Sequence, residues 1–260
     1  MTLNRTYGQK PFSSAASLRE FPRTATSRGI HVAPKTPMRN YEISALRPDG
    51  KVDTHQEVAP AMPLFESACS AFARGTVIAT PMGDIVVEDL QPGDMVNTST
   101  GEPATLVWIG SSSFVPGDAG RRTPLIRIMS DTFGQGRPAS FLTVGPSARI
   151  LHTPHHLRSE AGEKRLLTPV REFLDGVNVI EVVPPTPVRM FHFCLDRHAA
   201  ESAGGIEKET FHPGAQATRS LPIAVRDRFL GFFPHIDHVT DFGPLAHPRA
   251  PDHVLQAQAV

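Results

Sequence analysis

Short apolar runs separated by turn residues dominate the chain, and they predict strands. Two such runs, Val77–Ala79 and Ile85–Val87, flank a turn at residues 81–84 (P-M-G-D). β-Branched side chains crowd a helix but pack well on a pleated surface, so these runs are expected to pair as a hairpin. A second turn follows at residues 91–94 (Q-P-G-D), where proline fixes φ at one position and glycine supplies a positive φ at the next.

The same pattern recurs and predicts a single all-β domain. Intervals of about ten to twenty residues with turn chemistry between strands are typical of an all-β domain and not of a parallel α/β sheet. A Ser/Gly-rich loop is expected over residues 110–122, and the last two strands are expected to pair across a proline-rich turn. Trp108 is expected to anchor the core. The predicted strands cover residues 41–46, 51–54, 77–79, 85–87, 104–109, 123–129, 141–144, 148–151, 177–183 and 188–195.

Helical spacing of apolar residues occurs in two short segments. Phenylalanine and alanine residues three and four positions apart allow a short helix within residues 59–72. A second helix is predicted by the phenylalanines near residues 229–233, with Ser220 as its N-cap and Pro234 as its end. We expect this second helix to pack on its own domain, because it is short.

These elements divide the chain into four parts. Residues 1–38 mix basic, hydroxyl and proline residues without a sustained period, and they are expected to form a flexible N-terminal arm. Residues 39–70 are expected to form a docking hairpin and a short helix, because a two-stranded hairpin is marginal alone. The main domain is expected over residues 71–214, and residues 215–260 are expected to form a C-terminal helix and an extended tail.

Composition narrows the class of protein. The 26 basic and 26 acidic residues cancel, so nothing favours nucleic acid or an anionic membrane as a partner. There is no signal peptide pattern and no long apolar segment, so we expect a protein that is not inserted in a membrane and is cytoplasmic or non-classically exported. The two cysteines, Cys69 and Cys194, do not make a disulfide framework and are expected to be buried.

Three blocks of sequence carry a family resemblance. Residues 75–94 follow the pattern G-T-x-I-x-T-P-x-G-x-x-x-V-E-D-L-x-P-G-D, and residues 142–151 resemble L-x-V-S-P-Q-H-R-V-L. Residues 188–198 resemble V-x-Y-x-H-x-x-L-D-R-H, and residues 209–214 resemble E-S-F-H-P-G. Together they resemble the stand-alone bacterial branch of the Hint family, the self-processing fold of hedgehog proteins and inteins. The resemblance implies a curved all-β Hint fold with the former site in a central cleft.

The resemblance also implies which residues should carry chemistry. In the family, a Cys or Ser attacks the carbonyl carbon of the residue before it, and a histidine protonates the departing amide nitrogen. The nucleophile position is Ala71 here, the histidine position is Ala148, and a Ser/Thr position is Gly145. A methyl group cannot act as a nucleophile, so we predict a catalytically degenerate module without catalytic residues or a cofactor, kept for binding or assembly with an unidentified protein partner.

Residual autoprocessing is the alternative hypothesis. Cys69 or Ser70 could replace the missing nucleophile only if the strand slipped in register. In the late block, His192, Asp196 and His198 are candidate polar residues, since late-block groups in the family assist cyclisation or activate the second nucleophile. We favour structural roles for them, with Asp196 pairing with its neighbour Arg197, because polar groups at strand ends normally satisfy each other or the backbone.

A metal-dependent hydrolase is a second alternative. Histidines cluster at His152, His155 and His156, and again at His235 and His238. Zinc sites need three or four ligands that converge with fixed geometry, whereas these residues lie in proline-interrupted loops without cysteine partners. We therefore expect solvated loop histidines and no metal.

Overall fold

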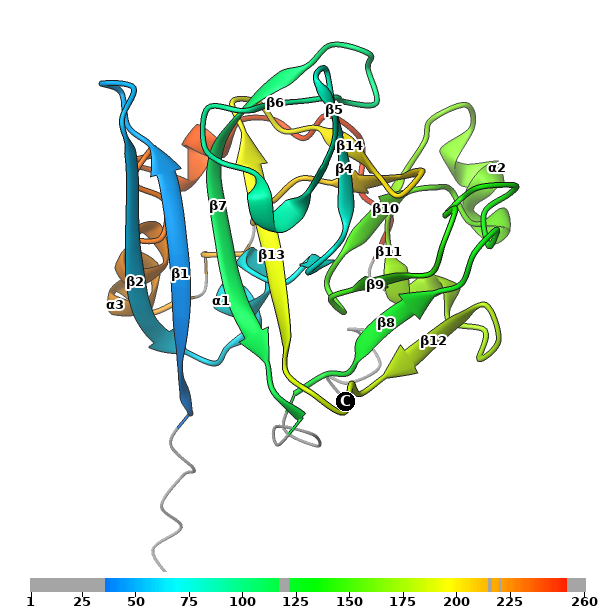
Figure 1. Ribbon diagram of the computed structural model, residues 1–260, viewed down its shortest axis with the longest axis horizontal. Coiled ribbons are helices and arrows are strands. Elements are labelled where there is room, and N and C mark those ends of the chain that lie inside the picture. The colour runs from blue at the N-terminus through cyan, green and yellow to red at the C-terminus, as the bar shows by residue number, and fades with distance from the viewer. Residues whose placement is uncertain (1–35, 117–121, 215–216, 220, 252–260) are drawn as a thin grey trace, which may run out of the picture. The chain divides into compact units, whose positions relative to one another are not determined.

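The computed structural model describes residues 36–116, 122–214, 217–219 and 221–251, and these residues form two β-sheets joined by short helices (Figure 1). The all-β prediction is confirmed. The predicted N-terminal arm, apart from its last three residues, lies outside the described residues, as does Ser220.

The larger sheet has the strand order β12-β8-β9-β3-β13-β7-β1-β2, with β6 also pairing with β7. All its pairings are antiparallel. Its strands are β1 (Met38–Leu46), β2 (Val52–Pro60), β3 (Phe72–Ala73), β6 (Met95–Val96), β7 (Ala104–Phe114), β8 (Leu125–Ile128), β9 (Leu142–Val144), β12 (Val179–Val182) and β13 (Val188–Leu195).

The smaller sheet has the order β11-β10-β15-β14-β4-β5. Three of its strands, β11, β14 and β15, were not predicted, although the Gly204-Gly205 pair between β14 and β15 is a typical two-residue hairpin turn. The strands are β4 (Val77–Thr80), β5 (Gly83–Val86), β10 (Arg149–Leu151), β11 (Leu167–Pro169), β14 (Ala200–Ala203) and β15 (Ile206–Glu209).

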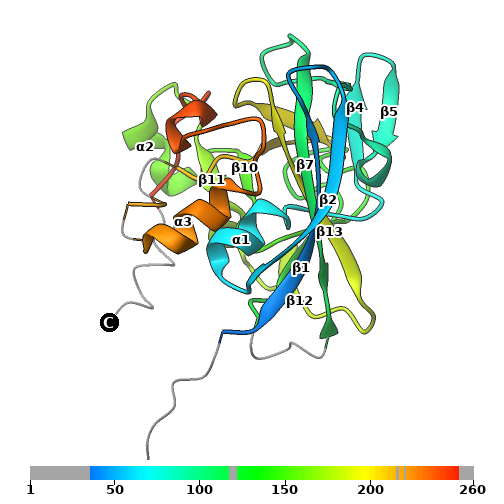
Figure 2. The same cartoon turned by 90° about the vertical axis from the view of Figure 1, so that its left-hand side faces the viewer.

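Helices are short and lie outside the sheets. The α-helices are α1 (Pro63–Ala68), α2 (Arg158–Ala161) and α3 (Ile223–Leu230), and the 3-10 helices are η1 (Val87–Asp89), η3 (His155–Leu157), η4 (Val170–Phe173) and η5 (Val239–Phe242). Figure 2 shows α1 and α3 side by side, and their Phe65 and Phe229 rings lie 6.0 Å apart. The helix α3 ends at Leu230, so Phe232 and Phe233 follow it instead of lying within it. None of the helices in the described part of the chain is long and apolar enough to cross a membrane.

The predicted N-terminal hairpin is present and extends the larger sheet. Strands β1 and β2 pair along their full length, and β1 pairs with β7. Two other expectations were wrong. Residues 110–114 continue β7 instead of forming a loop, because they pair with β13. The strands β12 and β13 do not pair with each other, since β12 pairs with β8 while β13 lies between β3 and β7.

Two large apolar clusters make up most of the core among the described residues. One fills the region between the sheets and contains Ala71 and Ala148. The other lies between the N-terminal hairpin and the C-terminal segment, and it is rich in aromatic rings. Trp108 is fully buried there, as predicted, and its Nε1–H donates to the carbonyl of Phe232. The C-terminal segment is therefore an integral part of the described structure.

Candidate functional site

The peptide between Ser70 and Ala71 is held at the entry to β3, at the position where the sequence places the former nucleophile. The Ala71 N–H donates to the Phe191 carbonyl at 2.8 Å, which continues the pairing of β3 with β13. The Ala71 carbonyl accepts from the Gly145 N–H at 3.1 Å. The backbone is thus fixed from both sides by strands that come from distant parts of the sequence.

The side chains of Ala71 and Ala148 are packed in the core. They are 2% and 3% exposed, and both belong to the apolar cluster between the sheets. The resemblance implied a central cleft at the former site, whereas in this structure both side chains lie in the packed core. The neighbours close over a methyl group because interiors pack to a density that leaves few voids.

Gly145 closes the remaining space beside the same peptide. A Cβ atom built on Gly145 would lie 1.5 Å from the Ser70 carbonyl oxygen and 2.7 Å from its carbon. These are backbone atoms, so no rotamer change could relieve the overlap. A nucleophile at position 71 would attack the Ser70 carbonyl. That carbonyl occupies the space in which any residue other than glycine at position 145 would place its Cβ atom.

Cys69 and Ser70 have their side chains held away from this carbonyl. The Ser70 hydroxyl donates to the Glu66 carbonyl at 2.5 Å, at the end of α1. Cys69 is fully buried, and its Sγ lies against Gly110 and Trp108, within 2.7 Å of a Cβ built on Gly110. Burial raises the pKa of the Cys69 thiol well above its ordinary value, so the thiol stays protonated.

His192 lies close to the same junction but is held by backbone carbonyls. Its Nδ1 is 2.8 Å from the Ser67 carbonyl oxygen, and its Nε2 is 3.3 Å from that of Glu209. Burial lowers the pKa of His192 to about 4, although both carbonyls favour the protonated form. A neutral imidazole can donate through only one nitrogen, and the shorter contact favours Nδ1. With Nδ1 as the donor, His192 ties β13 to the Ser67 carbonyl at the end of α1.

His192 should make stability depend on pH. Its pKa of about 4 in the folded protein lies below the 6.5 of an unperturbed histidine, so the unfolded chain binds a proton first as the pH falls. We expect this group to remove about 3 kcal/mol of stability between pH 6.5 and pH 4. Replacing it, as in His192→Gln, should flatten the fall in unfolding free energy measured by urea denaturation across this range.

Other groups in the protein also titrate between pH 4 and pH 6.5. The His192→Gln variant therefore needs a control in which a different histidine is replaced by glutamine. His156 is exposed on η3 and makes no such contacts, which makes His156→Gln the control. The control should reproduce the pH dependence of the unaltered protein. Identical slopes for His192→Gln and the unaltered protein would contradict the expectation.

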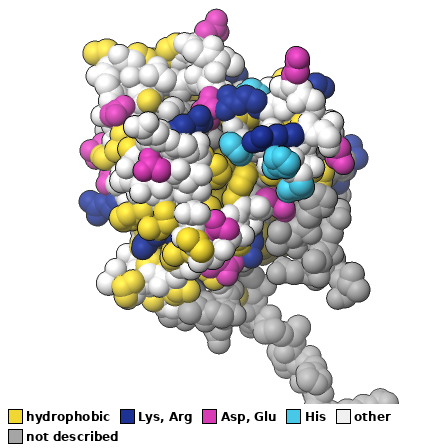
Figure 3. Space-filling view, turned by 90° about the vertical axis from the view of Figure 1, so that its right-hand side faces the viewer, with side chains coloured by type: hydrophobic (Ala, Val, Ile, Leu, Met, Phe, Trp, Pro, Cys, Tyr) yellow, Lys and Arg dark blue, Asp and Glu magenta, His cyan; other side chains and the backbone are white. Residues whose placement is uncertain are grey.

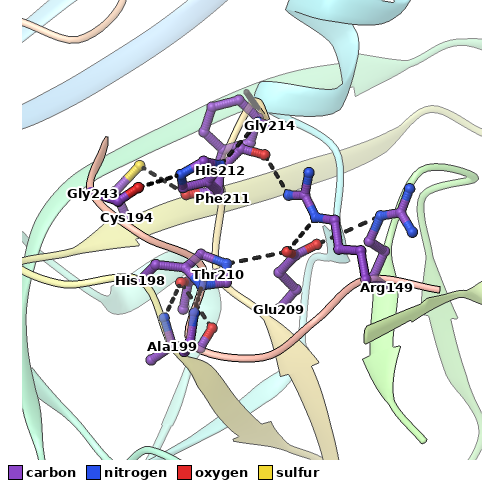
Figure 4. Close-up of polar contacts among 12 residues, drawn as sticks. Arg149, Cys194, His198, Ala199, Glu209, Thr210, Phe211, His212, Gly214 and Gly243 are labelled. Atoms are coloured by element: carbon purple, nitrogen blue, oxygen red, sulfur yellow. Dashed lines mark hydrogen bonds and ion pairs between the residues drawn. The ribbon is translucent and has the colours of Figure 1, made fainter. Parts of the chain in front are cut away.

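His198 belongs to a polar network around Glu209 (Figure 4). Its Nε2–H donates to Glu209 Oε1 at 3.1 Å, while its Nδ1 accepts from the Ala246 N–H at 2.9 Å. Arg249 Nε donates to the same carboxylate oxygen at 2.8 Å. Burial alone would raise the pKa of Glu209, but His198 and Arg249 outweigh it and hold that pKa below its usual value.

This network binds the C-terminal segment to the domain. Arg249 also donates to the His212 carbonyl at 2.7 Å, and the His212 ring donates to the Gly243 carbonyl at 3.0 Å. The backbone of residues 248–250 pairs with Leu167 in β11. His198 thus contacts the tail through Nδ1 and Glu209 of β15 through Nε2, which supports the structural role favoured for it.

Asp196 follows β13 and is exposed. It pairs with Arg197 at 3.4 Å, as the structural interpretation of this residue predicts. Its N–H donates to the Thr105 carbonyl, which continues the contact with β7. Asp196 lies outside the Glu209 network and makes no hydrogen bond to Ala71 or Ala148 within the described structure.

The remaining histidines are dispersed. His155 and His156 are exposed on η3, beside α2, and Lys, Arg and His side chains gather on the face seen in Figure 3. His152 lies against Phe133 and Phe173, and burial with the nearby arginines lowers its pKa. His238 caps η5. Within the described ranges, no group of three or more His, Cys, Asp or Glu residues could hold a metal ion.

Sequence analysis missed two charged residues in the core. Glu201 and Lys208 face each other across β14 and β15, and they are 0% and 1% exposed. The Lys208 Nζ lies 4.1 Å from the centroid of the Phe72 ring. Neither carboxylate oxygen of Glu201 nor the Lys208 Nζ has a hydrogen-bond partner among the described residues. The Gly204-Gly205 turn is the sequence signal that could have predicted this pairing.

Burial of this pair shifts both groups toward their neutral forms. It raises the pKa of Glu201 to about 8 and lowers the pKa of Lys208 to about 8, while each charge partly stabilises the other. An isolated buried charge costs several kcal/mol, so unpaired ionised forms are strongly disfavoured here.

Comparison with known proteins shows the family to which the chain belongs. A family model described as the Hint domain matches residues 70–215, more than half of the chain. Similar solved structures include a bacterial intein-like domain from Clostridium thermocellum, at 13% identity and a TM-score of 0.38, which covers 55% of this chain and 99% of that chain. The MchDnaB-1 intein, at 13% identity and a TM-score of 0.34, covers 54% of this chain and 100% of its own. No curated protein matches the chain.

Proposed function

Because this chain belongs to the Hint domain family, we propose that it is a catalytically degenerate member that acts as a binding or assembly module. The observation that carries the proposal is the packing around the Ser70–Ala71 peptide. Ala71 and Ala148 are buried together in an apolar cluster, and the Ser70 carbonyl oxygen lies against Gly145. An acyl shift at this peptide would need a nucleophile, a proton donor and space, and these residues supply none of the three.

The alternative of residual autoprocessing requires a substitute nucleophile. The Ser70 hydroxyl donates a hydrogen bond to the Glu66 backbone carbonyl, and the Cys69 thiol is buried with a raised pKa. Using either residue would require a register shift of β3, which would break its pairing with β13 and β9. We therefore propose that both residues serve packing and hydrogen bonding.

A binding role needs a surface, and one cavity lies where the late block meets the C-terminal segment. It has a volume of about 350 Å³. Its wall combines apolar side chains with histidines and carboxylates, a mixture typical of ligand sites. Lining residues include Cys194, His198, Phe211, His235, Asp237 and Phe242. This cavity supports the proposal of a binding module, because the Hint core and the tail build it together.

The test is whether the full chain stays intact. We expect the purified protein to keep its full-length mass during incubation at neutral pH, alone, with dithiothreitol and with hydroxylamine, because no acyl intermediate forms for these nucleophiles to attack. Intact-mass spectrometry measures this directly. Fragments that end at residues 68–71 and increase with time would contradict the proposal.

A double variant, Cys69→Ala with Ser70→Ala, identifies the source of any cleavage. If the unaltered protein were cleaved and this variant were not, residual autoprocessing through one of these residues would replace degeneracy as the function. Cleavage of both proteins at the same rate would point to a contaminating protease, which a protease-inhibitor arm removes. Full-length mass in every arm supports degeneracy.

A further inference from the structure

We propose that the cavity between the end of β13 and the C-terminal segment binds a small organic ammonium ion with an apolar body. The inference rests on the proposed binding role and names the class of ligand. The cavity volume of about 350 Å³ lies at the lower end of the range of about 300–1,000 Å³ for ligand pockets. A molecule of the size of a phenylalkylamine fits such a space.

The floor of the cavity is apolar. Cys194, Leu195 and Phe211 line it and are buried. Cys194 and Phe211 lie side by side (Figure 4), and the Cys194 thiol donates to the Phe211 carbonyl at 3.7 Å. The Phe242 ring packs edge-on against Phe211, with 5.8 Å between the ring centroids. A phenyl or alkyl group would lose its contact with water against these side chains, and the aromatic rings also attract cations.

The rim of the cavity is negatively charged. Three exposed carboxylates line it, and no Lys or Arg side chain of the described residues does so. Arg197 pairs with one of the three, Asp196, so Asp237 and Asp241 supply the net charge. The backbone N–H groups of His238 and Asp237 donate to Asp241 and hold its pKa below the usual value. Asp241 therefore stays ionised at neutral pH.

The two histidines of the wall do not offset this charge. His198 accepts the Ala246 N–H at Nδ1 and donates from Nε2 to Glu209, which is the neutral form of the ring. Burial lowers the pKa of His235 to about 4, so this ring is also neutral at neutral pH. An apolar floor below a negative rim favours a cation with an apolar body over a neutral or anionic molecule of the same shape.

Asp237 offers the carboxylate that a ligand can engage at the least cost. Its backbone N–H donates to Asp241, but its own carboxylate has no hydrogen bond or ion pair within the described part of the chain. An ammonium ion therefore displaces no existing contact there. Asp241 is unsuitable for substitution, because its side chain caps η5.

An NMR titration of the isotope-labelled full chain at neutral pH and low salt tests the proposal. Phenethylammonium should bind at least about fivefold more tightly than the neutral phenethyl alcohol, because a charge pair at a rim changes affinity by about this factor. The anion hydrocinnamate should bind more weakly than the alcohol. Methylammonium lacks the apolar body and should bind at least about tenfold more weakly than phenethylammonium. Equal affinities for phenethylammonium and the alcohol, or no binding of phenethylammonium, would overturn the proposal.

A variant tests the rim. Asp237→Asn removes the charge and keeps the shape of the side chain, so it should weaken phenethylammonium binding about fivefold and leave phenethyl alcohol binding unchanged. The matched control is Asp227→Asn, at an exposed aspartate of α3 that does not line the cavity. The control should bind both probes as the unaltered chain does. Unchanged phenethylammonium affinity in Asp237→Asn would also overturn the proposal.

The outcome is separable from that of the intact-mass test. A chain that keeps its full-length mass but does not bind phenethylammonium would overturn the ligand class and leave catalytic degeneracy standing. A chain that cleaves itself would overturn degeneracy, whatever affinities the titration gives.

Discussion

Replacing Gly145 by alanine should destabilise the protein by about 3 kcal/mol or more, or prevent folding altogether. The added Cβ would lie 1.5 Å from the Ser70 carbonyl oxygen, so one of two hydrogen-bonded strands must move. The φ of Gly145 is not positive, so the cost comes from lack of space and not from backbone strain. Urea denaturation followed by circular dichroism measures the change.

Gly231 is the matched control for this substitution. It follows α3 with φ of −57°, and a Cβ built there meets the Arg228 carbonyl oxygen at 3.2 Å. Gly231→Ala should change the unfolding free energy by less than about 1 kcal/mol, because the Arg228 carbonyl needs to move by only a few tenths of an ångström and the stiffer unfolded chain offsets that cost. Equal effects of the two substitutions would show that the space beside Ser70 is not as tight as the geometry indicates.

Phe233→Ala should cost about 3–5 kcal/mol, the usual range for truncating a buried phenylalanine. Phe233 is fully buried, and its ring lies 4.6 Å from Trp108 and 5.3 Å from Phe211. It also contacts Phe229 and Phe242. These contacts join the C-terminal segment to β7 and to Phe211, which follows β15, so the variant should also expose residues after 221 to limited proteolysis.

Phe141 provides the comparison for Phe233. Its side chain is 57% exposed and lies against Arg127, with 4.8 Å between the guanidinium carbon and the ring centroid. Phe141→Ala should cost less than about 1 kcal/mol, since an exposed cation–π contact contributes little. A Phe233→Ala protein as stable as Phe141→Ala, with an equally protease-resistant tail, would mean that the C-terminal segment folds independently of the domain.

Much of the fold was predictable because its determinants are local. The runs at residues 77–79 and 85–87 lie on either side of a turn, and they form β4 and β5. The turn before Lys51 correctly predicted the N-terminal hairpin. The wrong predictions concerned pairing between segments that are distant in the sequence. Strand β12 pairs with β8, about fifty residues earlier in the chain, and no pattern within either strand specifies that pairing.

The candidate site divides in the same way. The motif blocks predicted roles for positions 71, 145 and 148, because each block has its own spacing, and those roles stay predictions. The contacts that these three residues make could not be predicted from the sequence. The contact between Gly145 and the Ser70 carbonyl joins segments that are about 75 residues apart, and the Glu209 network depends on Arg249 from the tail.

The sequence by itself determined the strand-rich architecture, the family and the absence of a nucleophilic side chain at position 71, because apolar spacing, turn residues and side-chain identity are properties of the chain. Only the tertiary structure decided that Ala71 and Ala148 are buried, that His198 contacts the tail, and that Glu201 faces Lys208 in the core. The physical reason is that burial and strand pairing depend on distant segments, and both protonation and available space follow from them.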